Sequence, residues 1–262
     1  MVNQGNGSNG RTSVNLLFLG QCLQYAYPGV DESDTFPQLA RSMLTARFPH
    51  FEFNLDRKYV YHPKGLRAIL QHRLQFRTPD IVVIAVSGIF AASRWRVNMI
   101  YEIAPEVIDT ARSFLQRIDA KLEGQYRSKA TEKLLDSIFS WHPPITLPEY
   151  EKLLEEAVLM CRNTAGAAVV LIGPSRCDDD TDEGYALQSP ELWRSVNQMA
   201  LRLGERLRIP VLDTQDLFTD FGREVIVPGT VKYSLYGHQV VAREVQRILG
   251  AEAAALDPSG SQ

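Results

Sequence analysis

The sequence predicts an α/β domain in which a doubly wound parallel sheet lies between two layers of helices. Three short runs, at residues 14–19, 81–86 and 167–172, have the apolar and β-branched character of buried parallel strands. Between them, apolar residues recur every three to four positions, which is typical of helices with one buried face. This alternation favours a parallel sheet, and 262 residues suit a single large core.

The other elements follow from the same two patterns. Two further strands are expected, at residues 51–55 and 210–212. Helices are expected at residues 35–48, 64–76, 190–207 and about 235–249. Pro49 is the stop signal of the first helix, and Pro79 leads into the central strand at 81–86.

Residues 91–165 interrupt the alternation. They contain helical patterns, at 101–122 and 149–161, and no credible strand, so we expect a helical insertion that forms a cap or an interaction surface. The single domain is expected to span 13–250.

Residues 1–12 and 251–262 have the composition of disordered tails. An acidic loop at 178–183 lacks the spacing of a calcium loop, and we interpret it as solvated.

Composition excludes several classes of function. The net charge of -3 gives no electrostatic footprint for nucleic acid or an anionic membrane surface. No apolar run is long enough to span a bilayer, and the first residues lack the apolar segment of a signal peptide. Three cysteines without tight spacing, Cys22, Cys161 and Cys177, argue against a disulfide scaffold and a zinc site. We therefore expect a reduced, cytoplasmic protein without a metal or cofactor.

Cys22 is the first candidate for chemistry. The apolar run before it stops at Gly20, which places the thiol at a strand-to-helix turn, where many α/β enzymes hold a nucleophile. A thiol is partly ionised at neutral pH, and a helix N-terminus would lower its pKa further. The alternative is that Cys22 is a small buried residue that only fills the turn. Cys161 lies on the apolar face of a helix pattern and is expected in the core.

Several segments in the same order resemble the SGNH/GDSL hydrolases over about residues 14–250. The family's first motif, Gly-Asp-Ser, corresponds to Gly20, Gln21 and Cys22. Its second motif, a Gly that opens a helix, corresponds to Gly65. The third, Gly-x-Asn-Asp, falls on residues 87–90, which are Ser-Gly-Ile-Phe. The resemblance implies a three-layer, flavodoxin-like α/β/α fold.

The last motif of the family is the most altered. Gly237 and His238 match the Gly-His pair that trails the catalytic residues, and this alignment places the catalytic Asp and His on Gly229 and Lys232. We also interpret His238 as a histidine at a helix start that bonds to backbone. Asp213 resembles a structural aspartate of the family.

The resemblance implies ester or thioester hydrolysis, or acyl transfer, through Cys22. In the family, two backbone N–H groups and an Asn side chain donate hydrogen bonds to the oxyanion. A His takes the proton of the nucleophile, and an Asp orients this His. Here the backbone donors would be Cys22 and Gly65, Ile89 cannot replace the Asn, and the base is missing. Lys232 or His62 is the candidate cation beside the thiol.

The substrate would be a small or carrier-bound acyl compound, and the oligomeric state stays open. Its expected binding residues are Gln21, Ser87, Gly88, Arg94 and His238. The competing interpretation is a non-catalytic SGNH-like binding or scaffold protein.

Overall fold

A five-stranded parallel sheet forms the centre of the protein. The computed structural model describes residues 12–21, 24–60, 63–92, 95–98, 139–142, 145–175, 190–228 and 230–256. The strand order is β2-β1-β3-β6-β7. The strands are β1 (Thr12–Gly20), β2 (Phe51–Tyr59), β3 (Ile81–Ala85), β6 (Ala168–Ile172) and β7 (Val211–Leu212).

The predicted central strand is confirmed. In β3, Val83 pairs with Phe18 of β1 on one side and with Val170 of β6 on the other. These strands are buried on both faces, which is why they are nearly continuous apolar runs. β2 is longer than predicted, because its polar residues 56–59 still pair with β1 at the edge of the sheet.

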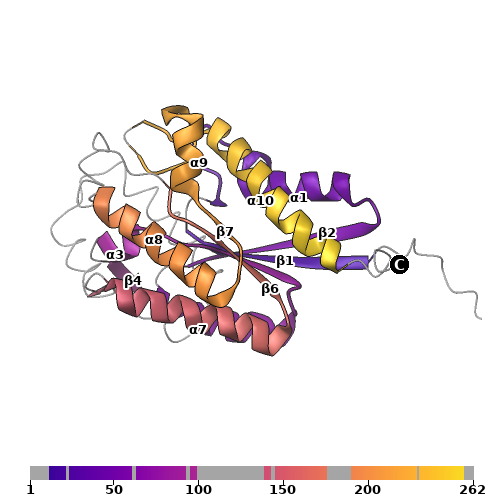
Figure 1. The fold of residues 1–262 in the computed structure, drawn as a ribbon, viewed down its shortest axis with the longest axis horizontal. Coiled ribbons are helices and arrows are strands. Elements are labelled where there is room, and N and C mark those ends of the chain that lie inside the picture. The colour runs from indigo at the N-terminus through magenta and orange to yellow at the C-terminus, as the bar shows by residue number, and fades with distance from the viewer. Residues whose placement is uncertain are drawn as a thin grey trace, which may run out of the picture.

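Helices cover both faces of the sheet (Figure 1). One face carries α1 (Phe36–Arg47), α9 (Thr214–Phe221) and α10 (Leu235–Ala255). The other carries α2 (Leu66–Phe76), α7 (Leu147–Ala165) and α8 (Pro190–Leu207). Side chains of β1 alternate between the two cores: Phe18 packs with the first set and Leu19 with the second. The predicted three-layer architecture is therefore confirmed.

The prediction that residues 91–165 contain no strand is wrong. After the short helix α3 (Ile89–Ala92), β4 (Trp95–Asn98) pairs in antiparallel fashion with β5 (Phe139–His142). Four-residue strands are too short to produce a recognisable alternation in the sequence. The predicted helix at 101–122 and the acidic loop at 178–183 lie outside the described residues.

The last part of the predicted insertion, α7, belongs to the main fold. α7 contains the predicted helix at 149–161 and packs in the same core as β3, β6 and α2. Thr146 caps its start by accepting a hydrogen bond from the Glu149 N–H, and Gly166 ends it with a φ of 65°. α7 is therefore the crossover helix between β3 and β6, and not part of a separate insertion.

The predicted tails are also corrected at their inner ends. Thr12 already belongs to β1, and α10 continues through Ala255, with Ala253 buried in the core. None of the helices in the described ranges has both the length and the hydropathy needed to cross a membrane.

Candidate active site

The topology brings the predicted site residues to one edge of the sheet. The chain leaves β1 for β2 through α1 on one face, and leaves β2 for β3 through α2 on the other. The carboxyl ends of β1 and β3 therefore meet at a topological switch point, where ligands bind in open α/β sheets. Gln21 directly follows β1 at this point, and Ser87 and Gly88 closely follow β3.

A buried hydrogen bond joins the ends of these two strands. Gln21 is only 4% exposed, and its Oε1 accepts a hydrogen bond of 2.6 Å from the Ser87 hydroxyl. The Ser87 N–H in turn donates to the Tyr150 hydroxyl of α7 at 3.0 Å. Burial holds the pKa of Tyr150 well above its usual range. The Gln21 amide nitrogen, Nε2, is buried without an acceptor.

Gly88 is a glycine because α8 packs directly on it. A Cβ at this position would lie 2.4 Å from Cδ2 of the Trp193 ring. Trp193 is 1% exposed, and its Nε1–H is buried without an acceptor. Two buried donors, one from Gln21 and one from Trp193, thus lie near the turn after β3, and neither has an acceptor among the described residues.

The segment that follows β1 is tied to β2. The Gln24 N–H donates to the Gln21 carbonyl at 3.2 Å. The buried Gln24 side chain donates to the Lys58 carbonyl at 2.9 Å. Arg57 donates to the Gln24 carbonyl at 2.8 Å and forms an ion pair with Glu32.

Cys22 itself lies outside the described residues. Residues 24–35 contain a 3-10 turn, η2 (Glu32–Asp34), and no α-helix, and α1 begins only at Phe36. The helix predicted at 35–48 is thus confirmed to within one residue at each end.

Gly65 reaches the same edge from β2. It ends the 3-10 turn η3 (Pro63–Gly65) and precedes α2, as the resemblance implied. The segment after β2 lies against β1, since the Val60 N–H donates to the Gly20 carbonyl at 2.7 Å. None of the described residues comes within 4 Å of a Cβ built on Gly65. His62 and Arg94 lie outside the described residues.

Lys232 lies in the segment before α10. Its Nζ is 5.4 Å from the centre of the Tyr27 ring, a cation–π geometry. The hydroxyl of Ser175, just beyond β6, donates to the Val231 carbonyl at 2.8 Å, which holds this segment at the carboxyl edge of the sheet. Lys232 is therefore at the correct edge, while Gly229 lies outside the described residues.

His238 is buried and bonded to backbone. Its Nδ1 accepts a hydrogen bond from the Phe36 N–H at 3.1 Å, and its Nε2 has no partner. The rings of Phe36, Tyr27 and Tyr233 pack around it. Burial lowers the pKa of His238 to about 4. Within the described ranges no carboxylate bonds to this imidazole, so its backbone bond and ring contacts fit the structural interpretation of this residue.

The two other family-like positions also have packing roles. A Cβ on Gly237 would lie 2.0 Å from the Val225 carbonyl oxygen, so α10 can approach that backbone only with glycine here. Asp213 is the N-cap of α9, where it accepts from the Gln215 and Asp216 N–H groups. Cys161 is buried in α7, as predicted, and burial raises its pKa to about 12.

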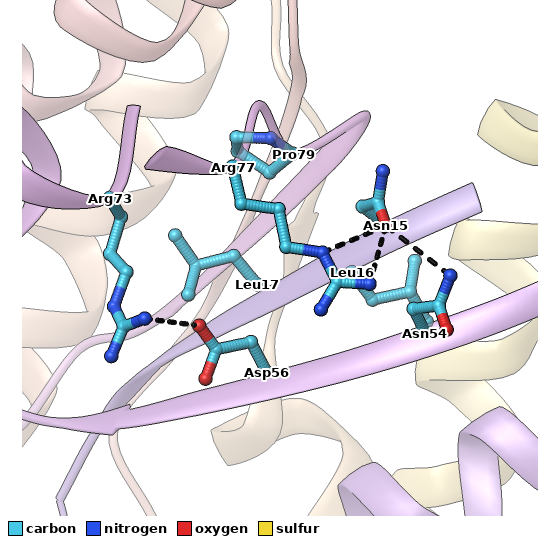
Figure 2. Close-up of a pocket in the computed structure, with 8 residues that line it drawn as sticks. All are labelled: Asn15, Leu16, Leu17, Asn54, Asp56, Arg73, Arg77 and Pro79. Atoms are coloured by element: carbon cyan, nitrogen blue, oxygen red, sulfur yellow. Dashed lines mark hydrogen bonds and ion pairs between the residues drawn. The ribbon is translucent and has the colours of Figure 1, made fainter. Parts of the chain in front are cut away.

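A small hollow lies toward the other end of β1 (Figure 2). Its volume of about 10 Å³ leaves room for about one water molecule. Figure 2 shows its polar groups turned toward one another: Arg77 donates to Asn15, and Arg73 pairs with Asp56. This hollow is separate from the switch point and has the character of a polar packing cluster.

The sequence patterns did not identify Tyr150 and Trp193. Both lie on buried helix faces, where an aromatic residue looks like ordinary core. Their contacts with Ser87 and Gly88 depend on how α7 and α8 cross the end of β3, which no local pattern encodes.

Comparison with known proteins gives structural matches alone. No family model and no curated protein matches the sequence. Among solved structures, the lipase/acylhydrolase from Enterococcus faecalis is 14% identical with a TM-score of 0.58, over 89% of this chain and 96% of that one. The protein TesA is 14% identical with a TM-score of 0.56, over 91% and 99% of the two chains.

A third match is Axe2, an acetylxylan esterase from Geobacillus stearothermophilus. It is 17% identical with a TM-score of 0.56, over 92% of this chain and 96% of that one. At such identities the likeness concerns the fold, which extends over nearly the whole of each protein. The chain therefore has the three-layer α/β/α fold of these lipase and esterase structures, as the resemblance to the SGNH/GDSL hydrolases implied.

Proposed function

We propose that this protein hydrolyses ester or thioester bonds, or transfers the acyl group, with Cys22 as the nucleophile. The observation that supports the proposal is that Gln21, the residue before Cys22 in the sequence, lies at the switch point of the sheet. Solved proteins with the same fold include an acetylxylan esterase and a lipase/acylhydrolase. A small-molecule or carrier-bound acyl compound is the proposed substrate class.

The chemistry suits a cysteine better than a serine. The Cys22 sulfur forms a bond to the acyl carbon, the carbonyl electron pair moves to oxygen, and the collapse of this oxyanion expels an alcoholate or thiolate. Water or an acceptor then takes the acyl group from sulfur. A thiolate depends less on a general base than a hydroxyl does, which fits the replacement of the family's His by Lys232. The ammonium of Lys232 is proposed to favour the thiolate, and the Gly65 N–H to donate to the oxyanion.

A non-catalytic binding protein is the second candidate. It is favoured by the burial of His238, which bonds to the backbone of Phe36 and does not replace the missing base. In that case the same pocket would bind an acyl compound without forming a bond to it.

The mass of the intact protein distinguishes the two functions. Incubation with p-nitrophenyl acetate or an acyl thioester should add one acyl group, and Cys22→Ala should abolish the adduct. Cys161→Ala is the matched control and should leave the adduct unchanged, because this buried thiol has its pKa raised to about 12. Cys22→Ser should be nearly inert, since a hydroxyl without a base is a weaker nucleophile. An unmodified mass, with Cys22 no more reactive toward iodoacetamide than in the unfolded chain, would establish the binding function.

A further inference from the structure

We propose that the side-chain amide of Gln21 binds the carbonyl or carboxylate oxygen of the acyl ligand, and that Ser87 orients this amide. The inference rests on the proposed function, because it assigns a donor to the same site. Its starting point is that Gln21 Nε2 is buried at the switch point and donates to no group in the part of the chain that the structure describes.

The hydrogen bond from Ser87 decides which way the amide faces. Ser87 Oγ donates to Gln21 Oε1 at 2.6 Å, and the two amide atoms lie on opposite sides of the same planar group. Occupation of Oε1 therefore turns the two Nε2 protons away from Ser87. The Ser87 backbone is itself held through its N–H by the Tyr150 hydroxyl at 3.0 Å, so the orienting group is fixed by α7.

A buried donor without an acceptor is unfavourable unless a ligand or a water molecule accepts its hydrogen bond. The surroundings of Gln21 contain a second such group, because the Trp193 Nε1–H is also unpartnered and its ring packs on Gly88, the residue after Ser87. Both groups are neutral donors. This chemistry favours an oxygen acceptor and offers no recognition for a cation.

Gln24, in the same segment, differs from Gln21 in that its amide nitrogen has an acceptor, although its Oε1 has none among the described residues. It is as deeply buried as Gln21, but its Nε2 donates to the Lys58 carbonyl at 2.9 Å. Its amide nitrogen is therefore used in holding the segment to β2. Gln24 provides a matched control for the loss of a buried glutamine that does not contact the ligand.

The predicted consequence concerns the oxyanion. The third motif of this chain has Ile89, whose side chain has no hydrogen-bond donor. An amide that donates to the oxygen as negative charge develops there would accelerate acylation, and loss of one such donor slows turnover by about 10²–10³-fold. Gln21→Met, which removes the donor and keeps the length of the side chain, should reduce the rate of Cys22 acylation by that factor.

The test compares two reagents on the full chain. Acylation by p-nitrophenyl acetate forms an oxyanion, whereas alkylation by iodoacetamide displaces iodide without one. Gln21→Met should slow acylation and leave alkylation within about twofold, while Gln24→Met should leave the ratio of the two rates unchanged. Ser87→Ala should give an intermediate loss that Ser87→Thr restores, because threonine keeps the orienting hydroxyl. Equal acylation by Gln21→Met and the unmodified protein would overturn the inference and leave the proposed function standing.

Binding of octanoate, followed by ligand-observed NMR, separates the two failures. Gln21→Met should weaken octanoate binding by about tenfold, which corresponds to loss of one hydrogen bond to a charged oxygen. If the unmodified protein binds octanoate but forms no acyl adduct, the proposed function fails, and a weakened Gln21→Met complex still supports the donor. Absence of octanoate binding, or equal binding by Gln21→Met and the unmodified protein, refutes the assignment of Gln21 as a donor to the ligand.

Discussion

The buried imidazole of His238 makes the stability of this protein depend on pH in a calculable way. His238 is neutral in the folded state, since burial lowers its pKa to about 4 from an ordinary value of 6.5. In the unfolded chain it takes up a proton at a higher pH. Stability is therefore fully present above pH 6.5 and is lost as the pH falls toward the folded pKa.

The magnitude follows from the difference between the two pKa values. A difference of about 2.5 pH units, at 1.36 kcal/mol per unit, amounts to about 3 kcal/mol in total. About 2 kcal/mol of this should be lost between pH 7.5 and pH 5. The rings packed around the imidazole, Tyr27, Phe36 and Tyr233, do not ionise in that window. Protonation of Nδ1 would also break the hydrogen bond from the Phe36 N–H, which links α1 to α10.

Urea unfolding at a series of pH values measures this effect. The appropriate comparison is His238→Asn, which cannot take up a proton and can still accept a hydrogen bond from the Phe36 N–H. The variant should be less stable at pH 7.5, because the ring contacts are lost, but its stability should fall less steeply toward pH 5. Parallel curves for the two proteins would refute the assignment of a neutral, buried His238.

Three substitutions test the packing around the site by urea unfolding. Gly88→Ala should destabilise the fold by about 1–3 kcal/mol, because the new Cβ would lie 2.4 Å from the Trp193 ring, which must move away. A variant as stable as the wild type would show that α8 can move at little cost in free energy. Asp213→Ala should cost about 1–2 kcal/mol, since it removes the α9 cap and the partner of Asn197 at 2.8 Å; a change below about 0.5 kcal/mol would contradict this. Arg206→Ala should cost less than about 1 kcal/mol, because its two carboxylate partners on α7 form exposed ion pairs, and a larger loss would show tighter coupling of α7 to α8.

The roles of the two glutamines show what a sequence pattern conveys about a site. Gln21 stands out because it replaces the Asp of a recognisable motif, whereas Gln24 belongs to no motif. Both are buried, and only the fold determines that the Lys58 carbonyl accepts from the Gln24 amide nitrogen while the Gln21 amide nitrogen has no acceptor in the described ranges. The difference arises from partners that lie 34 and 66 positions away in the chain.

The outer part of the fold also shows where local patterns fail. The strands β4 and β5 were missed, because two four-residue strands become a ladder only through pairing across a separation of about 40 residues. The tail predicted from residue 251 is partly helical, because α10 continues far enough to bury Ala253. In both cases the deciding interaction is with a part of the chain far away in sequence.

By itself, the sequence determined the layered α/β/α architecture and the central position of β3, and it predicted a candidate site at the ends of β1 and β3. These follow from strands buried on both faces, whose apolar runs are visible locally, and from the order of strands and helices. Only the tertiary structure decided that α7 is a layer of the fold, that Phe36 is the backbone partner of His238, and that the Gln21 amide nitrogen is buried with no acceptor among the described residues. Those properties depend on which groups meet across the folded chain, since hydrogen-bond partners and burial are set by packing and not by neighbours in sequence.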